Sequence, residues 1–294
     1  MPVSFSRTRL LYLSVGSRFR RGGTLAFVLV LLFPGPGGCL SPEQAQQSSG
    51  AADPGQWELQ QWGIAPEWSE PEEQVPFVLA GLPSDAPERF VLPGMLAPGD
   101  QLGQASGTAW AVGYAATTYL FRTKRNQHDY ECAPAFIYNQ LNERADRGIE
   151  IIEAAELVKR MGCPRENLMP YQAADYVSRP TAAALADARE HRIRGYGRVD
   201  FVDLNQIRAH LLQGSVVIVT LRISENFIGL RENVWENPAG RQRGRHTLAV
   251  IGYDNAQGVF IVQNSAGGRW GSYGRAAIPY VWFVRLAQKA YVVW

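Results

Sequence analysis

The side chains that could act as nucleophiles, general bases or metal ligands are few and widely spread in this chain of 294 residues. The four histidines are His128, His191, His210 and His246, and no two of them occur at a spacing typical of a metal site. The sequence therefore predicts no metal ion and no bound cofactor. Any chemistry would have to come from isolated side chains that the fold brings together.

The three cysteines fall into two groups. Cys39 ends a segment that resembles a targeting signal, so that Cys132 and Cys163 remain in the part that should fold. An even pair of cysteines in an exported domain favours one disulfide, and two unpaired thiols in the core are the alternative. Cys132 precedes one predicted helix and Cys163 follows the next, which is compatible with a bridge.

One histidine, His246, begins an apolar run that reads HTLAVIGY. This pattern predicts a strand. A single histidine in an apolar strand is more often a core residue than a catalyst, so the local pattern alone assigns it no role. The segments around it must decide.

Three segments resemble the papain-like cysteine peptidases, in their bacterial branch. Residues 100–111 read DQLGQASGTAWA and resemble DQGQLGSCTAFA, where the nucleophilic cysteine lies six residues after a glutamine, at the start of a buried helix. Residues 245–253 read RHTLAVIGY and resemble the histidine segment GHAVxxVGYD, and residues 260–265 read FIVQNS and resemble FxxxNSWG. The resemblance covers roughly residues 88–285. It implies an α+β, papain-like fold of two subdomains: a helical half with a central buried helix, an antiparallel β-sheet half and a cleft between them.

The resemblance also implies which residues would form the site. Gln101 matches the glutamine of the oxyanion hole, His246 the general base and Asn264 the residue that orients the base. Without a gap in the alignment, Gly107 occupies the position of the nucleophile, and a shifted frame puts Ala109 there instead. Neither residue can attack a carbonyl. The implied site is thus a remnant with no intact catalytic set.

The neighbouring positions depart from the family as well. Ala266 replaces the tryptophan that shields the asparagine–histidine bond. Ser106 is predicted to cap the central helix, and Thr108 follows the empty position. Because successive residues at a helix start project about 100° apart, neither hydroxyl is expected to face His246. A displaced serine or threonine nucleophile remains the alternative.

The order of the predicted elements, helices first and strands second, fits the same α+β class. Helices are predicted at residues 108–122, 133–140, 148–161 and 203–213, with a short connection or helix at 182–192. Strands are predicted at 193–199, 216–221, 246–253, 259–264 and 275–280. Residues 222–245 are predicted to form a long charged loop that could carry recognition.

The chain divides into a targeting segment, a tether and one papain-like domain. The predicted boundaries are 1–39, 40–56 and 57–294, the last containing an N-terminal strap (57–99), the helical half (100–180) and a mainly β half (181–294). An inhibitory pro-segment is the alternative for the strap. The run LAFVLVLLF is too short to span roughly 30 Å of hydrocarbon, which takes about 20 residues. With PGPGGC after it, the segment resembles a bacterial lipoprotein signal with Cys39 as the lipidation candidate. Plain secretion and an uncleaved anchor are the alternatives.

The charge pattern argues against a nucleic-acid partner, because the formal net charge is only +2 and no basic patch stands out. We therefore expect a catalytically inactive papain-like protein, exported and anchored on the outer, periplasmic side of a membrane by an N-terminal lipid or anchor. It would bind or scaffold protein partners in an envelope complex. One alternative is an active peptidase or acyl transferase that uses an unconventional nucleophile with His246 and Asn264. Another is a purely structural subunit whose cleft is unused.

Overall fold

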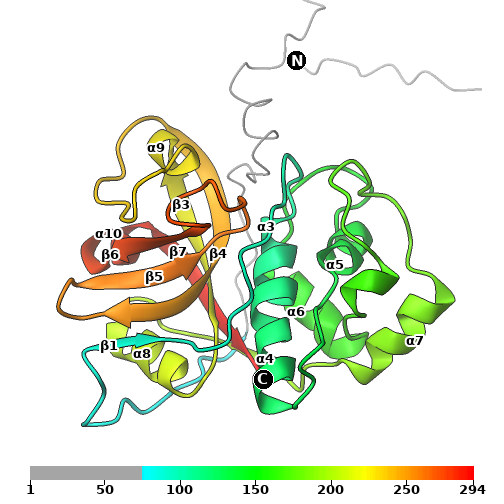
Figure 1. The fold of residues 1–294 in the computed structure, drawn as a ribbon, viewed down its shortest axis with the longest axis horizontal. Coiled ribbons are helices and arrows are strands. Elements are labelled where there is room, and N and C mark those ends of the chain that lie inside the picture. Colours follow the sequence, from blue (N-terminus) through cyan, green and yellow to red (C-terminus); the bar gives the residue numbers. More distant parts are fainter. Residues whose placement is uncertain (1–74) are drawn as a thin grey trace, which may run out of the picture. The chain divides into compact units, whose positions relative to one another are not determined.

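The computed structural model describes residues 75–294, which form a helical half and a sheet half with a long central helix at their junction (Figure 1). This is the predicted α+β arrangement of two subdomains. In chain order the helical segments are α3 (Gly107–Ala109), the π-helical segment η1 (Trp110–Thr117), α4 (Thr118–Lys124), α5 (Pro134–Leu141), α6 (Ile151–Arg160), the 3-10 helix η2 (Glu166–Leu168), α7 (Ala182–Glu190), α8 (Leu204–Leu212), α9 (Glu225–Ile228) and α10 (Tyr280–Leu286).

The strands form one antiparallel sheet in the order β2-β7-β3-β4-β5-β6, and β1 pairs with β4. They are β1 (Arg89–Val91), β2 (Tyr196–Arg198), β3 (Val217–Ser224), β4 (Gln242–Asp254), β5 (Val259–Gln263), β6 (Arg275–Pro279) and β7 (Ala287–Val293). The longest strand, β4, lies inside the sheet and faces the central helix (Figure 1).

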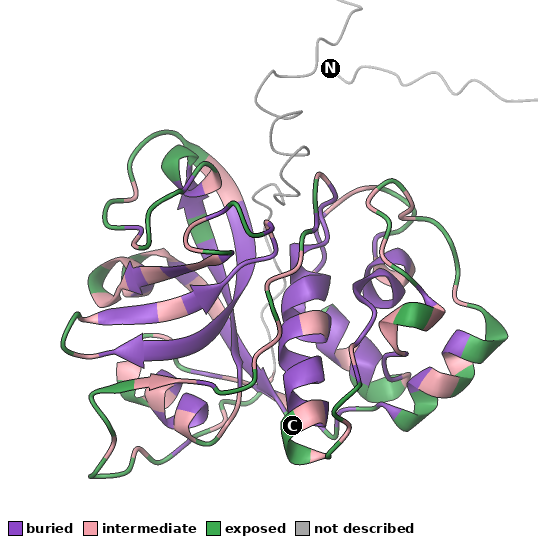
Figure 2. Cartoon of the chain, viewed as in Figure 1, coloured by how far each residue is buried: buried purple, intermediate pink, exposed green. Residues whose placement is uncertain are grey.

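The central helix, formed by α3, η1 and α4, is buried along most of its length (Figure 2). Up to Phe121 its small and apolar residues leave no polar face, as its sequence predicts, and the exposed polar residues come in its last turn. The π-helical stretch has a local cause, since the hydroxyls of Thr117 and Thr118 donate to the carbonyls of Val112 and Gly113, five residues earlier. Threonine hydroxyls that compete for backbone carbonyls often distort a helix.

Cys132 and Cys163 form a disulfide that joins the start of α5 to the end of α6, with a Cα–Cα distance of 5.5 Å. The central helix packs closely against this bridge. A Cβ at Gly113 would lie 2.7 Å from the Cys132 Sγ, so only glycine fits there without a shift. The bridge and this close approach fix the helical half behind the central helix.

Three local predictions need correction. Residues 222–245 are not one long loop, because β3 continues to Ser224, α9 follows it and β4 begins at Gln242. The charged Arg222 faces solvent while its neighbours on β3 are buried, so charge in this stretch does not prevent a strand. The strap is not wholly irregular, since β1 extends the sheet. The last strand, β7, and the helix before it, α10, had no counterpart among the predicted elements.

Ser106 also differs from its prediction. It lies at the N-cap position of α3, but its side chain accepts no hydrogen bond from the helix. Its hydroxyl pairs instead with the Tyr171 hydroxyl at 2.8 Å. The nearby tyrosine thus competes with the helix end for this side chain.

The targeting segment, the tether and the candidate lipidation site Cys39 lie outside the described residues. Within residues 75–294, no helix combines the length and the apolar character needed to cross a membrane.

Candidate functional site

His246 and Asn264 form a buried hydrogen-bonded pair beside the central helix. Ala249 on β4 lies opposite Gln263 on β5, so the residue after β5, Asn264, follows at the level of Leu248, two residues from His246 along β4. The His246 Nε2 lies 2.7 Å from the Asn264 Oδ1, which also accepts the Ser265 backbone N–H at 2.8 Å. An amide oxygen can only accept, so His246 must donate from Nε2. Its Nδ1 is then left as the basic nitrogen of the neutral ring.

Gly107 lies directly in front of this basic nitrogen. A Cβ built on Gly107 would be 2.9 Å from the His246 Cε1 and 3.3 Å from the His246 Nδ1. The same Cβ would be 3.0 Å from the Gln101 Oε1. A side chain at position 107 would therefore point between the histidine and the glutamine. The gapless alignment is the one that this geometry supports, and the frame that uses Ala109 is not.

Gln101 is held by the loop that carries Asn264. Its backbone N–H donates to the Ser265 carbonyl at 2.8 Å, and the Ser265 hydroxyl donates to the Gln101 Oε1 at 2.6 Å. Its side-chain amide donates to the Gln104 carbonyl at 2.9 Å. The structure thus brings Gln101, Gly107, His246 and Asn264 together, as the resemblance implies.

The hydroxyls beside Gly107 have other partners. Ser106 pairs with Tyr171, as described above, and the Thr108 Oγ1 lies 3.0 Å from the Thr247 Oγ1. Thr247 in turn lies 3.1 Å from the Thr220 Oγ1. These contacts give both hydroxyls partners other than His246, on either side of the empty position.

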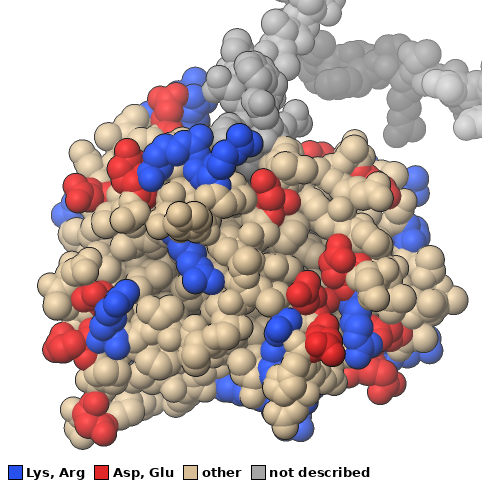
Figure 3. Space-filling view, in the orientation of Figure 1, with Lys and Arg blue, Asp and Glu red and all other residues tan. Residues whose placement is uncertain are grey.

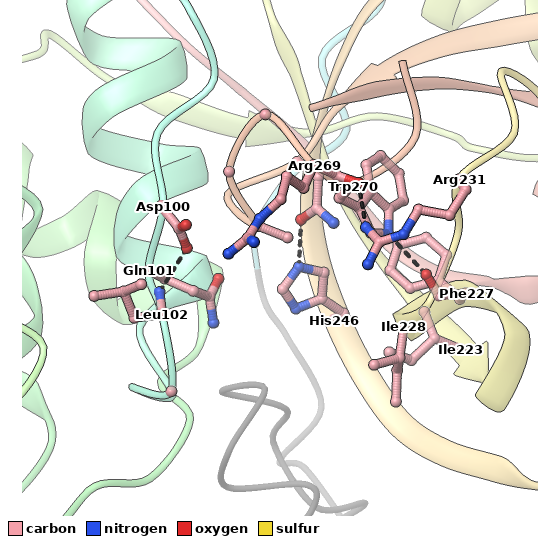
Figure 4. A pocket seen from close by; sticks show the side chains of 15 residues that line it. Asp100, Gln101, Leu102, Ile223, Phe227, Ile228, Arg231, His246, Arg269 and Trp270 are labelled. Carbon is pink, nitrogen blue, oxygen red and sulfur yellow. Dashed lines mark hydrogen bonds between the residues drawn. The ribbon is translucent and has the colours of Figure 1, made fainter. Parts of the chain in front are cut away.

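An open pocket of about 550 Å³ lies beside His246 and Asn264 (Figure 4). It is bounded on the helical half by Asp100, Gln101 and Leu102, and on the sheet half by α9 and the turn after β5. Ala266 lines it where the family has a large indole. The small side chains of Ala266 and the glycines after it therefore leave room beside the histidine.

The comparisons with known proteins agree with this geometry. The family model described as papain family cysteine protease matches residues 107–288. The chain belongs to the papain family. It is 24% identical over 208 residues to an uncharacterized peptidase C1-like protein of Acanthamoeba polyphaga mimivirus. The aligned region covers 64% of this chain and 66% of that protein. The chain is 25% identical over 175 residues to Peptidase 1 of Euroglyphus maynei, covering 57% of this chain and 53% of that one. The chain thus spans only about half to two thirds of these relatives.

Solved structures show the same fold. Xylellain, a cysteine protease from Xylella fastidiosa, superposes with a TM-score of 0.70 at 21% identity, covering 79% of this chain and 96% of that one. Procathepsin B S9 from Trypanosoma congolense superposes with a TM-score of 0.65 at 13% identity, covering 81% and 87%. At these identities the likeness establishes the papain-like fold alone.

The aromatic neighbour of the histidine was not predicted from the sequence. Phe227 on α9 has its ring centroid 6.0 Å from the imidazole of His246. The same ring packs on Trp270 at 5.0 Å, and the Trp270 indole donates to the Phe227 carbonyl at 2.7 Å. In this papain-family chain, a phenylalanine from the sheet half thus lies against the histidine. The position of the family's tryptophan is occupied by the small side chain of Ala266. The sequence signal was hidden in residues 222–245, which were interpreted as a loop.

On the other side of Gly107 the cleft is almost filled. The space bounded by Gly107, Ile149 and His246 measures only about 20 Å³. Glu150 lies at its wall, with its Oε1 3.8 Å from the Arg245 Nη2 and its Oε2 3.0 Å from the Lys289 Nζ. Burial lowers the pKa of Lys289 to about 8. Glu150 and Arg245 thus line the narrow side of the cleft, and Lys289 holds Glu150 from outside that space.

Burial also decides the charge of the histidines. It lowers the pKa of His246, although the hydrogen bond with Asn264 opposes the effect. The pKa values of His191 and His210 are lowered by burial too. His246 is therefore neutral near pH 7, as expected for an imidazole with no thiolate beside it. Within residues 75–294, no cluster of three or more metal-ligating side chains occurs.

Proposed function

We propose that this papain-family protein is catalytically inactive and uses its cleft to bind a protein partner. One observation carries the proposal. Position 107, where a side chain would point at both His246 and Gln101, is a glycine. Covalent catalysis in this family requires a nucleophile within reach of the base. Removal of a catalytic nucleophile typically costs many orders of magnitude in rate.

The two cysteines of the folded part and the two hydroxyls beside Gly107 support the same conclusion. The cysteines at 132 and 163 are joined to each other, and the hydroxyls of Ser106 and Thr108 are hydrogen-bonded away from His246. The hydrogen bond between His246 and Asn264 has a structural use. It satisfies two buried polar groups, whose isolation would cost about 1–3 kcal/mol each.

We further propose that the protein is exported and anchored on the outer side of a bacterial membrane, where it serves as a binding or scaffolding subunit of an envelope complex. The support for this part is the sequence of residues 1–39, with its short apolar run and Cys39. The tether of residues 40–56 would hold the domain away from the bilayer. Mass spectrometry of the mature N-terminus tests it, and an intact residue 1 would rule out both cleavage and acylation.

Co-purification from membranes tests the binding role of the cleft. Gly268 lines the open pocket, and a Cβ there meets no atom within 4 Å, so Gly268→Phe should fill space without straining the fold. Gly81 in the strap also has no atom within 4 Å of such a Cβ, and Gly81→Phe is the matched control. We expect Gly268→Phe to lose the partner and Gly81→Phe to keep it. Equal recovery with both variants would contradict cleft-mediated binding.

An active enzyme is the second candidate, because His246 still presents a basic Nδ1 to the cleft. A serine- or cysteine-reactive probe distinguishes the two functions. We expect the native chain and the His246→Ala variant to be labelled to the same low extent. Labelling that depends on His246 would show that another nucleophile acts, and would overturn the proposal of inactivity.

A further inference from the structure

The cleft is open on one side only of Gly107. The space on the side of Ala266 measures about 550 Å³, whereas the space on the side of Glu150 measures about 20 Å³. His246 lines both spaces, so they meet at the remnant site. A space of about 20 Å³ holds little more than one water molecule. A ligand side chain therefore has room on the side of Ala266 and very little on the side of Glu150.

The closed side would not open easily. The carboxylate of Glu150 lies between two cations, Arg245 and Lys289, and all three side chains are largely buried. Inserting an apolar side chain there would separate buried opposite charges, which is strongly unfavourable. The fold therefore favours a ligand that enters the open pocket and ends there.

The open pocket combines an apolar wall with a positive edge. Ile223, Phe227 and Ile228 form the apolar wall. Arg231 and Arg269 supply two guanidinium groups, and in Figure 4 the Arg269 side chain points from the sheet half towards Gln101. The Arg231 side chain donates to the Arg269 carbonyl, which keeps the two residues together.

Among the residues that line the pocket, two are arginines and one is a carboxylate, Asp100, whose Oδ1 already accepts the Leu102 backbone N–H at 2.9 Å. Glu232, next to Arg231, does not line the pocket, and its carboxylate accepts the Arg231 backbone N–H at 3.1 Å. Figure 3 shows several basic side chains on the surface over α9 and the neighbouring turns, with acidic side chains between them. A carboxylate should be preferred to an ammonium group here, because guanidinium groups bind carboxylates in a bidentate geometry.

We propose that the open pocket binds the C-terminal residue of a partner protein, with its terminal carboxylate at Arg231 and Arg269 and an apolar side chain against the wall formed by Ile223, Phe227 and Ile228. The one-sided space selects a chain end, and the positive edge selects the carboxyl end. The pocket volume is in the range typical of sites for small ligands, and it suffices for one large residue with part of the preceding one. This inference rests on the proposed binding function and names the ligand of the same cleft.

Two random octapeptide libraries provide the test, one with free C-terminal carboxylates and one with C-terminal amides, each immobilised through its N-terminus. The full-length chain is the probe. We expect it to bind the carboxylate library, with selection for a large apolar last residue, and to bind the amide library much more weakly. For a selected peptide, Arg269→Gln should weaken binding about tenfold, equivalent to about 1.4 kcal/mol. Arg189→Gln, which removes an exposed arginine of α7 outside the pocket, should leave binding unchanged.

Equal binding of acid and amide peptides, or selection of acidic residues inside amide-ended peptides, would overturn the proposal. Absence of binding to both libraries would overturn it as well. Each of these results leaves the proposed function to be judged separately by the co-purification of Gly268→Phe. If that variant loses the partner while the libraries show no preference for a free carboxylate, the cleft binds a partner in another way.

Discussion

The change Gly107→Cys tests whether the remnant site lacks only its thiol. The new Cβ would lie 3.3 Å from the His246 Nδ1, so a sulfur beyond it falls within hydrogen-bonding reach. It would also lie 2.9 Å from the His246 Cε1, which means that the imidazole must move by a few tenths of an ångström. Gly107 does not have a left-handed backbone conformation, so the substitution adds no backbone strain. We expect the variant to fold.

The new thiol should be activated by the start of the central helix and by His246. Its pKa should fall from about 8.5 to about 6, within the range of cysteines beside histidines and helix ends. The thiolate fraction at pH 6 then rises from about 0.3% to about 50%. Because a thiolate of lower pKa is a weaker nucleophile, the reactivity of each thiolate falls about tenfold. The net result is alkylation by iodoacetamide at pH 6 that is about tenfold faster than that of a free cysteine.

Alkylation of the variant, followed by mass spectrometry across pH 5–9, measures both quantities. Adding His246→Ala should return the rate at pH 6 to that of a free cysteine. Adding His128→Ala, which removes an exposed histidine, should not. A thiol that titrates near its ordinary pKa, or one that is indifferent to His246, would refute the assignment of Gly107 to the nucleophile position. We expect no cleavage of extended peptides even by the reactive variant, because Glu150 and its two cationic neighbours close one side of the cleft.

Three further predictions concern stability and can be measured by urea unfolding. Burial lowers the pKa values of His191, His210 and His246, so below about pH 6.5 the unfolded chain binds more protons than the folded one. The free energy of unfolding should therefore fall as the pH drops from about 7.5 to about 5.5. A flat profile would contradict the burial of these histidines. Replacing Cys132 and Cys163 together by alanine should lower the free energy of unfolding by about 3–4 kcal/mol, given the separation of 31 residues, and an unchanged midpoint would argue against the bridge. Phe227→Ala should cost about 3–5 kcal/mol, since its ring is buried against two tryptophans and His246, and a loss below about 1 kcal/mol would show that α9 is not packed as described.

The features that could be predicted are those determined by short stretches of sequence, namely the three site segments and the central helix. The segments around Gln101, His246 and Asn264 each carry enough spaced residues to be matched to the family, and the structure brings them together around Gly107. The buried central helix was predictable for the same reason, because a long run of small and apolar residues has few alternative structures.

The parts that escaped prediction depend on contacts between distant segments. Lys289 meets Glu150 across 139 positions of the chain, and no local pattern links them. Strand β7, which carries Lys289, contains polar residues that pairing with β3 accommodates in the sheet. Phe227 escaped because the charged residues around α9 resemble a loop. The shape of the cleft, open on one side and closed on the other, arises from these contacts and not from the motifs.

The two halves of the molecule are also joined at the floor of the cleft. Gln101 and Ser265 are linked through both backbone and side chain, and Thr108 and Thr247 share a hydrogen bond beside them. A rotation of the helical half away from the sheet half would break these buried hydrogen bonds. The pocket should therefore be preformed in the absence of a ligand. Association should then be a single step at an ordinary rate of about 10⁵–10⁷ M⁻¹s⁻¹, with no slow rearrangement afterwards. Partners that fit the pocket differently would then differ mainly in their dissociation rates. The lifetime of the complex would be the quantity open to regulation.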